Sequence, residues 1–129
     1  MNELPKILIV DDEPFNVDYL EQELECPEYE IITACNGQEA LEKVRSEAPD
    51  LVLLDIMMPL VDGFMVLSQL KEDPSTRDIP VVIISASNDL KNVVRGIQMG
   101  AEDYLPKPFE PTLLHARVSS SFEKKRLHD

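Results

Sequence analysis

Polar residues follow four apolar runs of this chain, at the point where each run ends. The polar residues are Asp11, Asp12, Asp55, Ser85 and Lys107, and the runs are residues 7–10, 51–54, 81–84 and 104–105. In an open α/β sheet, chemistry collects outside the carboxyl ends of the strands. We therefore expect three carboxylates, a hydroxyl and an ammonium group to meet at one edge. Such a set can bind a divalent cation and hold a phosphoryl group on a carboxylate.

Cation binding and phosphoryl transfer together explain why these residue types would occur at one edge. Carboxylates about 5 Å apart repel each other by roughly 3 kcal/mol per pair at an effective dielectric constant near 20, and a hard dication relieves that repulsion. Mg²⁺ prefers oxygen ligands and needs only one or two carboxylates besides substrate oxygens. One carboxylate can then act as the nucleophile, while the cation, the lysine and the hydroxyl stabilise charge on the transferred oxygens.

Each residue taken alone has an ordinary explanation. Acidic residues at strand ends often cap helices, serine is a common N-cap, and most lysines are simply solvated. The argument for a site rests on the joint pattern, because all of them follow strand ends in successive strand–helix units.

The elements that would position these residues are short strands alternating with amphipathic helices. We expect strands over 6–10, 31–34, 51–54, 81–84 and 103–105, and helices over 14–25, from Asn36 to before Pro49, over 63–71, from 90 to a stop at Gly100, and from 110–111 onward. Pro14 suits a first helical turn, and Asn36 with Glu39 predicts a capping box. Continuous Val/Ile/Leu strands between helices favour an α/β fold with a parallel sheet covered on both faces.

Length, composition and charge limit which kinds of protein this chain can be. The chain has 129 residues, 43% of them hydrophobic, which predicts one folded domain. Its formal charge of -13 disfavours direct binding to nucleic acid or to an anionic membrane surface. The apolar stretches are too short to span a bilayer, and the first residues do not look like a signal peptide. We expect a domain over 1–120, with 121–129 as an extension of the last helix.

Taken together, these residues resemble the receiver domains of two-component response regulators over about residues 5–120. The motifs are the acid pair, Asp-x-x-Met-Pro-x-x-x-Gly over 55–63, Ser85-Ala86, and Lys-Pro-Phe over 107–109. The resemblance implies a doubly wound, flavodoxin-like (βα)5 fold with strand order 2-1-3-4-5. It also implies a cytoplasmic signalling switch, not an enzyme acting on other molecules, that a histidine kinase or histidine phosphotransfer protein phosphorylates.

The same resemblance implies a role for each acidic residue. Asp55 would be the phosphoacceptor. Asp12 and Asp55 would ligate Mg²⁺ directly, with Mn²⁺ as an alternative ion, and Asp11 would ligate through water. The backbone carbonyl of Met57 would be a further metal ligand.

It also implies which residues meet the phosphoryl group. Ser85 and Lys107 would each contact a phosphoryl oxygen, and the small Ala86 would leave room for the group. The bond from Lys107 to Pro108 is expected to be cis, which would help to aim the lysine.

Three further positions would govern switching and lifetime. Tyr104 matches the aromatic switch position, although a half-exposed strand aromatic is the plain alternative. On phosphorylation, Ser85 and Lys107 would move to meet the new oxygens, and the vacated space would admit Tyr104. The surface of the fourth helix, fifth strand and fifth helix would then rearrange. Met57 and Ser87 would tune hydrolysis, unless Met57 only fills a gap.

The last predicted helix could connect this domain to a partner or to a following output domain. Leu114, Val118 and Phe122 recur every four residues, a stripe that we expect to face a partner helix. Residues 121–129 would continue toward an output domain beyond Asp129, with a nucleotide cyclase as one candidate, or would simply be a frayed helix end.

One assembly and two other functional classes complete the expectations. A homodimer through the fourth helix, fifth strand and fifth helix is one candidate assembly, with Asp103 and Arg117 paired across it. One other class is a receiver-like interaction module that does not use phosphate, which the complete polar set argues against. The second is a Mg²⁺-dependent phosphohydrolase of the haloacid-dehalogenase type. Those enzymes place the nucleophile at the end of the first strand, with a second Asp two residues later. Here the first strand ends in two adjacent acids, Asp11 and Asp12, and position 13 is Glu, so the match fails.

Overall fold

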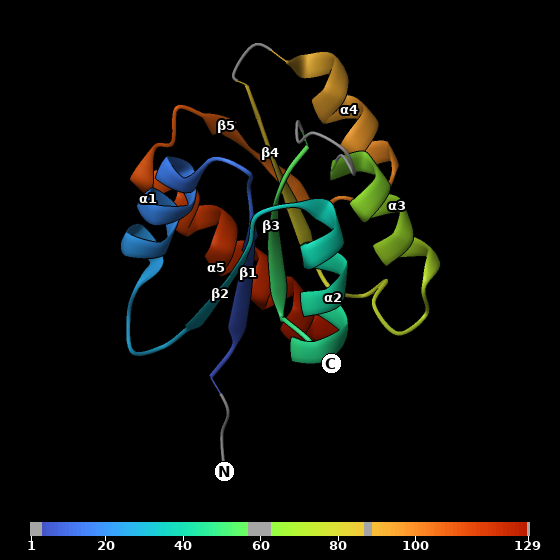
Figure 1. Cartoon of the computed structure of the whole chain (residues 1–129), viewed down its shortest axis with the longest axis horizontal. Coiled ribbons are helices and arrows are strands. Elements are labelled where there is room, and N and C mark those ends of the chain that lie inside the picture. Colours follow the sequence, from blue (N-terminus) through green and yellow to red (C-terminus); the bar gives the residue numbers. More distant parts are fainter. Residues whose placement is uncertain (1–3, 57–62, 87–88, 129) are drawn as a thin grey trace.

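Strands and helices alternate along the whole described chain. The structure is a computed structural model that describes residues 4–56, 63–86 and 89–128, with side chains up to residue 123. The strands and helices of Figure 1 are β1 (Lys6–Val10), α1 (Pro14–Leu24), β2 (Glu30–Ala34), α2 (Gly37–Glu47), β3 (Leu51–Asp55), α3 (Gly63–Glu72), β4 (Val81–Ala86), α4 (Leu90–Gln98), β5 (Asp103–Lys107) and α5 (Pro111–His128). The predicted alternation is confirmed.

The strands form one parallel sheet in the order β2-β1-β3-β4-β5. This confirms the doubly wound, flavodoxin-like architecture. Because β1 pairs with both β2 and β3, the chain leaves β1 toward one side of the sheet and later continues on the other side. In sheets of this kind, the crevice beyond such a reversal is where ligands bind.

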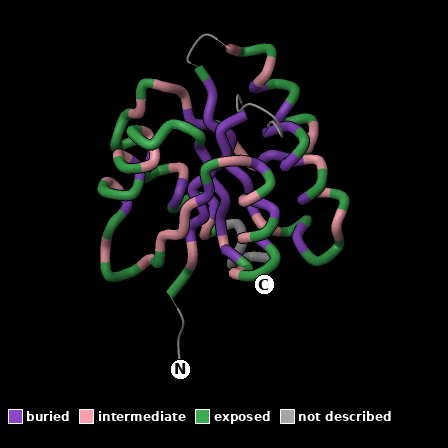
Figure 2. The backbone as a smooth tube through the Cα atoms, in the orientation of Figure 1, coloured by how far each residue is buried: buried purple, intermediate pink, exposed green. Residues whose placement is uncertain are grey.

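Apolar side chains from the sheet enter two cores, one on each face. Leu20 and Leu24 of α1 share a core with Leu114 and Val118 of α5. Helices α2 and α3 cover the opposite core, and Gly96 packs α4 against that same face, where a Cβ atom would lie 2.5 Å from Ile83 Cδ1. Figure 2 shows the strands as the buried centre of the molecule. This double burial explains why the strands are almost continuously apolar.

The start of α2 has the capping residues that the sequence predicts, with one difference. Asn36 Oδ1 accepts a hydrogen bond of 2.8 Å from the Glu39 backbone N–H. In a capping box the Glu39 carboxylate would accept from the N–H of Asn36 itself. Here Glu39 Oε1 accepts instead from the N–H of Cys35, one residue earlier, at 3.2 Å. Two N–H groups near the helix start are therefore satisfied.

The prediction that the stripe of α5 faces a partner helix is wrong. Leu114 and Val118 are fully buried beneath the sheet of their own domain. The Phe122 ring packs against Tyr29, with 5.2 Å between ring centroids, and Ser121 is also buried. A four-residue period shows that a helix has one buried face, but it does not show what covers that face.

An apolar stripe does reach the surface on α4. Leu90, Val94 and Ile97 are exposed there, and Val93 is buried. Tyr104 of β5 is exposed as well. Across residues 4–56, 63–86 and 89–128, no helix combines the length and apolar character needed to cross a bilayer.

Candidate functional site

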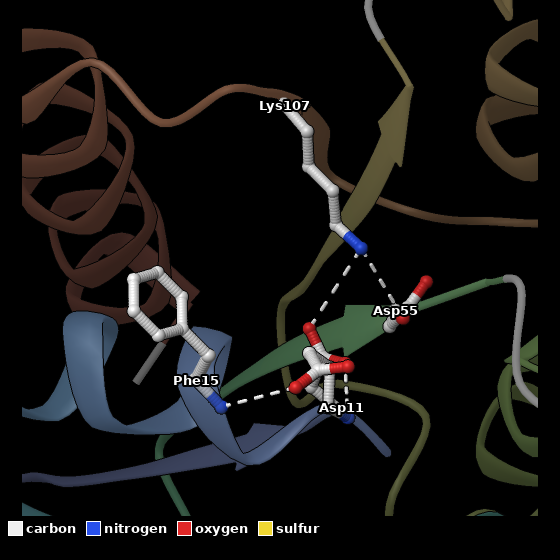
Figure 3. A network of polar contacts seen from close by, with 5 residues as sticks. Asp11, Phe15, Asp55 and Lys107 are labelled. Atoms are coloured by element: carbon white, nitrogen blue, oxygen red, sulfur yellow. Dashed lines mark hydrogen bonds and ion pairs between the residues drawn. The ribbon is translucent and has the colours of Figure 1, made fainter.

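The carboxyl ends of four strands bring the predicted site residues to one edge of the sheet. Asp55 ends β3, Lys107 ends β5, and Asp11 directly follows β1. The parallel register sets Asp55 opposite Ile84, one residue before Ser85. Figure 3 shows Asp11, Asp55 and Lys107 pointing toward one another.

Three carboxylates form the acidic part of this site. Asp11, Asp12 and Asp55 each place one oxygen so that all three oxygens lie within 4.8 Å of one another. Asp11 and Asp55 are 1% and 2% exposed, whereas Asp12 is exposed. Carboxylate oxygens this close, with an open side toward solvent, match the donor set that a hard dication prefers.

Asp11 has one satisfied oxygen and one that is not. Its Oδ1 accepts a hydrogen bond from the Glu13 backbone N–H at 2.9 Å. Its Oδ2 is buried and accepts no hydrogen bond from the described part of the chain. Burial, reinforced by the nearby charge of Asp55, raises the pKa of Asp11 to about 6. A bound cation would remove both the repulsion and the unsatisfied oxygen.

Ser85 contributes a second unsatisfied atom. Its side chain is 1% exposed, and its Oγ has no hydrogen-bond partner among the described residues. A buried hydroxyl without a partner costs about 1–3 kcal/mol. Such a group is poised to contact an additional ligand at the site. Ala86, which follows it, is exposed.

Lys107 is the cation of the site. Its Nζ lies 3.5 Å from Asp55 Oδ2 and 3.9 Å from Asp11 Oδ2, and its side chain is 32% exposed. The predicted cis bond between Lys107 and Pro108 is confirmed.

Gly63 allows α3 to begin against the end of β3. A Cβ atom on this residue would lie 2.4 Å from Ile56 Cα and 2.5 Å from the Asp55 carbonyl oxygen. Only glycine permits so close an approach. The glycine of the 55–63 motif therefore lets the start of α3 lie directly against the backbone of Asp55 and Ile56.

Tyr104 lies on the surface and is held by α5. It is 36% exposed. Arg117 donates from Nε to the Tyr104 carbonyl oxygen at 2.9 Å, and its guanidinium lies 5.6 Å from the Tyr104 ring centroid. Arg117 Nη1 also lies 3.4 Å from Asp103 Oδ2. The pair expected across a dimer is therefore made within one chain.

Two predicted positions lie outside the described residues. They are Met57, both as a metal ligand and as a tuning residue, and Ser87 as a tuning residue. Both stay predictions from the sequence.

Sequence reasoning missed an aromatic pair beside the site. Tyr19 of α1 and Phe109 stack with 5.5 Å between centroids and 8° between ring planes. Both rings line an apolar groove of about 250 Å³ that also includes Lys107 and the 77% exposed Phe15. The aromatic residue after Lys-Pro was visible in the sequence, but a partner 90 residues away (109 − 19) has no local signal.

Comparison with known proteins agrees with this geometry. A family model described as the response regulator receiver domain matches residues 7–119. Response regulator PleD of Caulobacter vibrioides is 46% identical over 115 residues, which cover 89% of this chain and 25% of that protein. The alkaline phosphatase synthesis transcriptional regulatory protein PhoP of Bacillus subtilis is 39% identical over 122 residues, covering 95% of this chain and 50% of that protein. The chain thus spans about a quarter to a half of these relatives.

Solved structures show the same fold. A putative response regulator from Chloroflexus aurantiacus superposes with a TM-score of 0.90 at 33% identity, covering 94% of this chain and 99% of that one. NtrX from Brucella abortus, in complex with ADP, gives a TM-score of 0.90 at 31% identity and covers 98% of this chain and 29% of that one.

Proposed function

This chain belongs to the receiver domain family of two-component response regulators, and we propose that Asp55 accepts a phosphoryl group from a histidine kinase or a histidine phosphotransfer protein. The observation that carries the proposal is the set around Asp55. A buried carboxylate lies beside Lys107, and the unsatisfied hydroxyl of Ser85 lies one position beyond the residue paired with it. The chain thus offers a nucleophile, a cation and a hydroxyl at one edge of the sheet, and this hydroxyl has no hydrogen-bond partner among the described residues.

The residues fit a divalent cation. Asp11, Asp12 and Asp55 would hold Mg²⁺, or Mn²⁺ in its place, since an oxygen of each lies close to the others. Asp11 Oδ2 is also buried and accepts no hydrogen bond from residues 4–56, 63–86 or 89–123. When bound, the ion neutralises charge on the transferred oxygens. Lys107 brings one positive charge to three carboxylates, at 3.5 Å from Asp55 Oδ2 and 3.9 Å from Asp11 Oδ2, so we expect transfer to depend on the ion.

Transfer requires one bond to form and one to break. An Asp55 carboxylate oxygen attacks phosphorus, and the bond between phosphorus and the donor histidine nitrogen breaks, leaving its electron pair on the imidazole. Lys107 stabilises one phosphoryl oxygen electrostatically, and Ser85 Oγ–H donates to another. The small side chain of Ala86 leaves space above Asp55.

The signal would then pass to the surface of α4, β5 and α5. Ser85 shifts toward the phosphoryl group, and Tyr104 moves from its exposed position into the space that Ser85 leaves. The apolar stripe of α4 lies on the same surface and suits a contact with a second copy or with an output domain. Because the chain spans only part of PleD and PhoP, an output beyond residue 129 belongs to the proposal.

The domain would act as a cytoplasmic switch and catalyse only its own phosphorylation and dephosphorylation. Its charge of -13 speaks against nucleic acid or an anionic membrane as a direct partner.

Intact mass after incubation with a small-molecule phosphodonor tests the proposal. We expect one phosphoryl group on the wild-type chain with Mg²⁺, none when the ion is chelated, and none on Asp55→Asn. Asp78→Asn, a change in the α3–β4 loop, is the matched control and should behave as wild type. A wild-type chain that never gains a phosphoryl group would support the phosphate-independent interaction module instead.

A further inference from the structure

We propose that Tyr19 is a positioning residue for the phosphoryl site, because its stacked contact with Phe109 fixes the backbone from which Lys107 extends. This inference rests on the proposed function, since Lys107 must contact the phosphoryl group for its position to matter. Tyr19 itself would touch neither the cation nor the phosphoryl group. It would act only through the loop that joins β5 to α5.

The contact joins two elements that are far apart in the sequence. Tyr19 and Phe109 are both half-buried, and their rings are nearly parallel, at 8° and 5.5 Å between centroids. Both rings pack against the core beneath α1 and α5. In Figure 1 the β5–α5 connection passes close to α1. The stack therefore ties this connection to α1.

Lys107 is held from both sides of its backbone. On one side, the register of the sheet sets Lys107 opposite Ala86 of β4. On the other side, only Pro108 separates it from Phe109, and the proline ring fixes one of the intervening dihedral angles. Anchoring the Phe109 ring thus leaves the Lys107 backbone few ways to move.

The position of the Lys107 backbone matters because its ammonium group lies at the end of a long side chain between two carboxylates. Its Nζ lies 3.5 Å from Asp55 Oδ2 and 3.9 Å from Asp11 Oδ2, and the side chain is 32% exposed. A long, partly solvated side chain gains little order from such contacts alone. A displacement of the order of 1 Å at a reacting centre lowers a rate by as much as about 100-fold. The stacked pair supplies order that the lysine lacks by itself.

The test compares Tyr19→Ala with variants that separate its possible effects. Tyr19→Phe keeps the ring and should behave as wild type. Phe109→Ala removes the other ring and should reproduce Tyr19→Ala, which also keeps the test decisive if Tyr19→Ala does not fold. Tyr29→Ala is the matched control, since Tyr29 packs on Phe122, 5.2 Å away, next to the first residue of β2 and thus at the amino edge of the sheet.

Two affinities are measured for each variant. Beryllofluoride, a phosphoryl analogue, is titrated in the presence of Mg²⁺ and followed by ¹⁹F NMR, and Mg²⁺ alone is titrated by calorimetry. Only the first ligand gains from Lys107, so Tyr19→Ala should weaken beryllofluoride binding about tenfold. Mg²⁺ affinity should stay the same or rise by no more than about fivefold, because a displaced ammonium group repels the ion less. General destabilisation would weaken both affinities together.

A double-mutant cycle with Lys107→Met completes the test. If Tyr19 acts through Lys107, adding Tyr19→Ala to Lys107→Met should change beryllofluoride affinity no further. Wild-type affinity in Tyr19→Ala, equal losses in Tyr19→Ala and Tyr29→Ala, or additive losses in the double mutant would each overturn the positioning role. A wild-type chain that takes neither phosphoryl group nor beryllofluoride would instead reject the proposed function itself.

Discussion

Lys107 Nζ lies 3.5 Å from Asp55 Oδ2, although 52 residues separate the two in the sequence. A charge-assisted hydrogen bond is usually about 2.7–2.9 Å long. The lysine also lies 3.9 Å from Asp11 Oδ2, so it is shared between two carboxylates and bound closely to neither. It thus partly neutralises the acidic cluster and remains able to turn toward a new anion.

Replacing Lys107 with Met should separate cation binding from phosphoryl binding. The ammonium group repels a dication held by Asp11 and Asp55, so its removal should raise Mg²⁺ affinity by about 1 kcal/mol, or roughly fivefold. The same change should slow phosphorylation by at least about tenfold, because a phosphoryl oxygen loses its partner. Calorimetry gives the first quantity and intact mass against time the second. A fall in Mg²⁺ affinity would contradict the assignment.

Asp11→Asn should stabilise the Mg²⁺-free protein at neutral pH. Burial raises the pKa of Asp11 to about 6 from an ordinary value of 3.8, so the ionised form is the one that the fold disfavours. Compared with Asp11→Asn, the wild-type free energy of unfolding is therefore little reduced below pH 4. The reduction grows between about pH 4 and pH 6, where the unfolded chain is ionised at Asp11 and the folded chain is not, and levels off at about 1–3 kcal/mol above pH 6. Asn keeps the oxygen that Glu13 N–H contacts. Denaturant unfolding at pH 4.5 and 7.5 checks this, and a difference that does not change with pH would refute it.

Ser85→Ala should affect function without weakening the fold. Because Ser85 Oγ is buried without a hydrogen bond among the described residues, removing it breaks no hydrogen bond there and relieves a desolvation cost. We expect a free energy of unfolding equal to or up to about 1 kcal/mol above that of wild type. Phosphorylation should nevertheless slow by about tenfold. A loss of more than about 1 kcal/mol in stability would show that the hydroxyl has a structural partner.

Gly63→Ala should disturb both the fold and the acceptor. The added methyl group would meet backbone atoms of Ile56 and Asp55 at 2.4 and 2.5 Å, and backbone cannot move aside cheaply. We expect a loss of about 1–3 kcal/mol in stability and slower phosphorylation. Gly96→Ala is the control, because its methyl would meet only the flexible end of Ile83. Equal effects of the two substitutions on phosphorylation would contradict a specific role for Gly63.

The site residues at the strand ends were the easiest to predict from the sequence. Asp11, Asp55 and Lys107 could be placed together because a parallel sheet brings all carboxyl ends to one edge, whatever the detail of the packing. The order of the strands came from the family resemblance, since nothing local in β1 shows that both β2 and β3 pair with it.

Side-chain contacts that depend on how separate elements are placed could not be predicted from the sequence. The stripe of Leu114, Val118 and Phe122 has the same period whether it faces a sheet or a partner helix. Asp103 and Arg117 have the same charges whether they pair within one chain or between two. The stack of Tyr19 on Phe109 depends on the placement of two separate elements, so only the structure shows it.

Chemical localisation of the phosphoryl group tests the central claim most directly. Borohydride reduces an acyl phosphate to an alcohol, which converts a phosphorylated aspartate to homoserine, and peptide mass spectrometry then locates that residue. After phosphorylation with Mg²⁺, we predict homoserine at position 55 and at no other acidic residue. Homoserine at position 11 or 12, or its absence from a chain that carries a phosphoryl group, would contradict Asp55 as the acceptor.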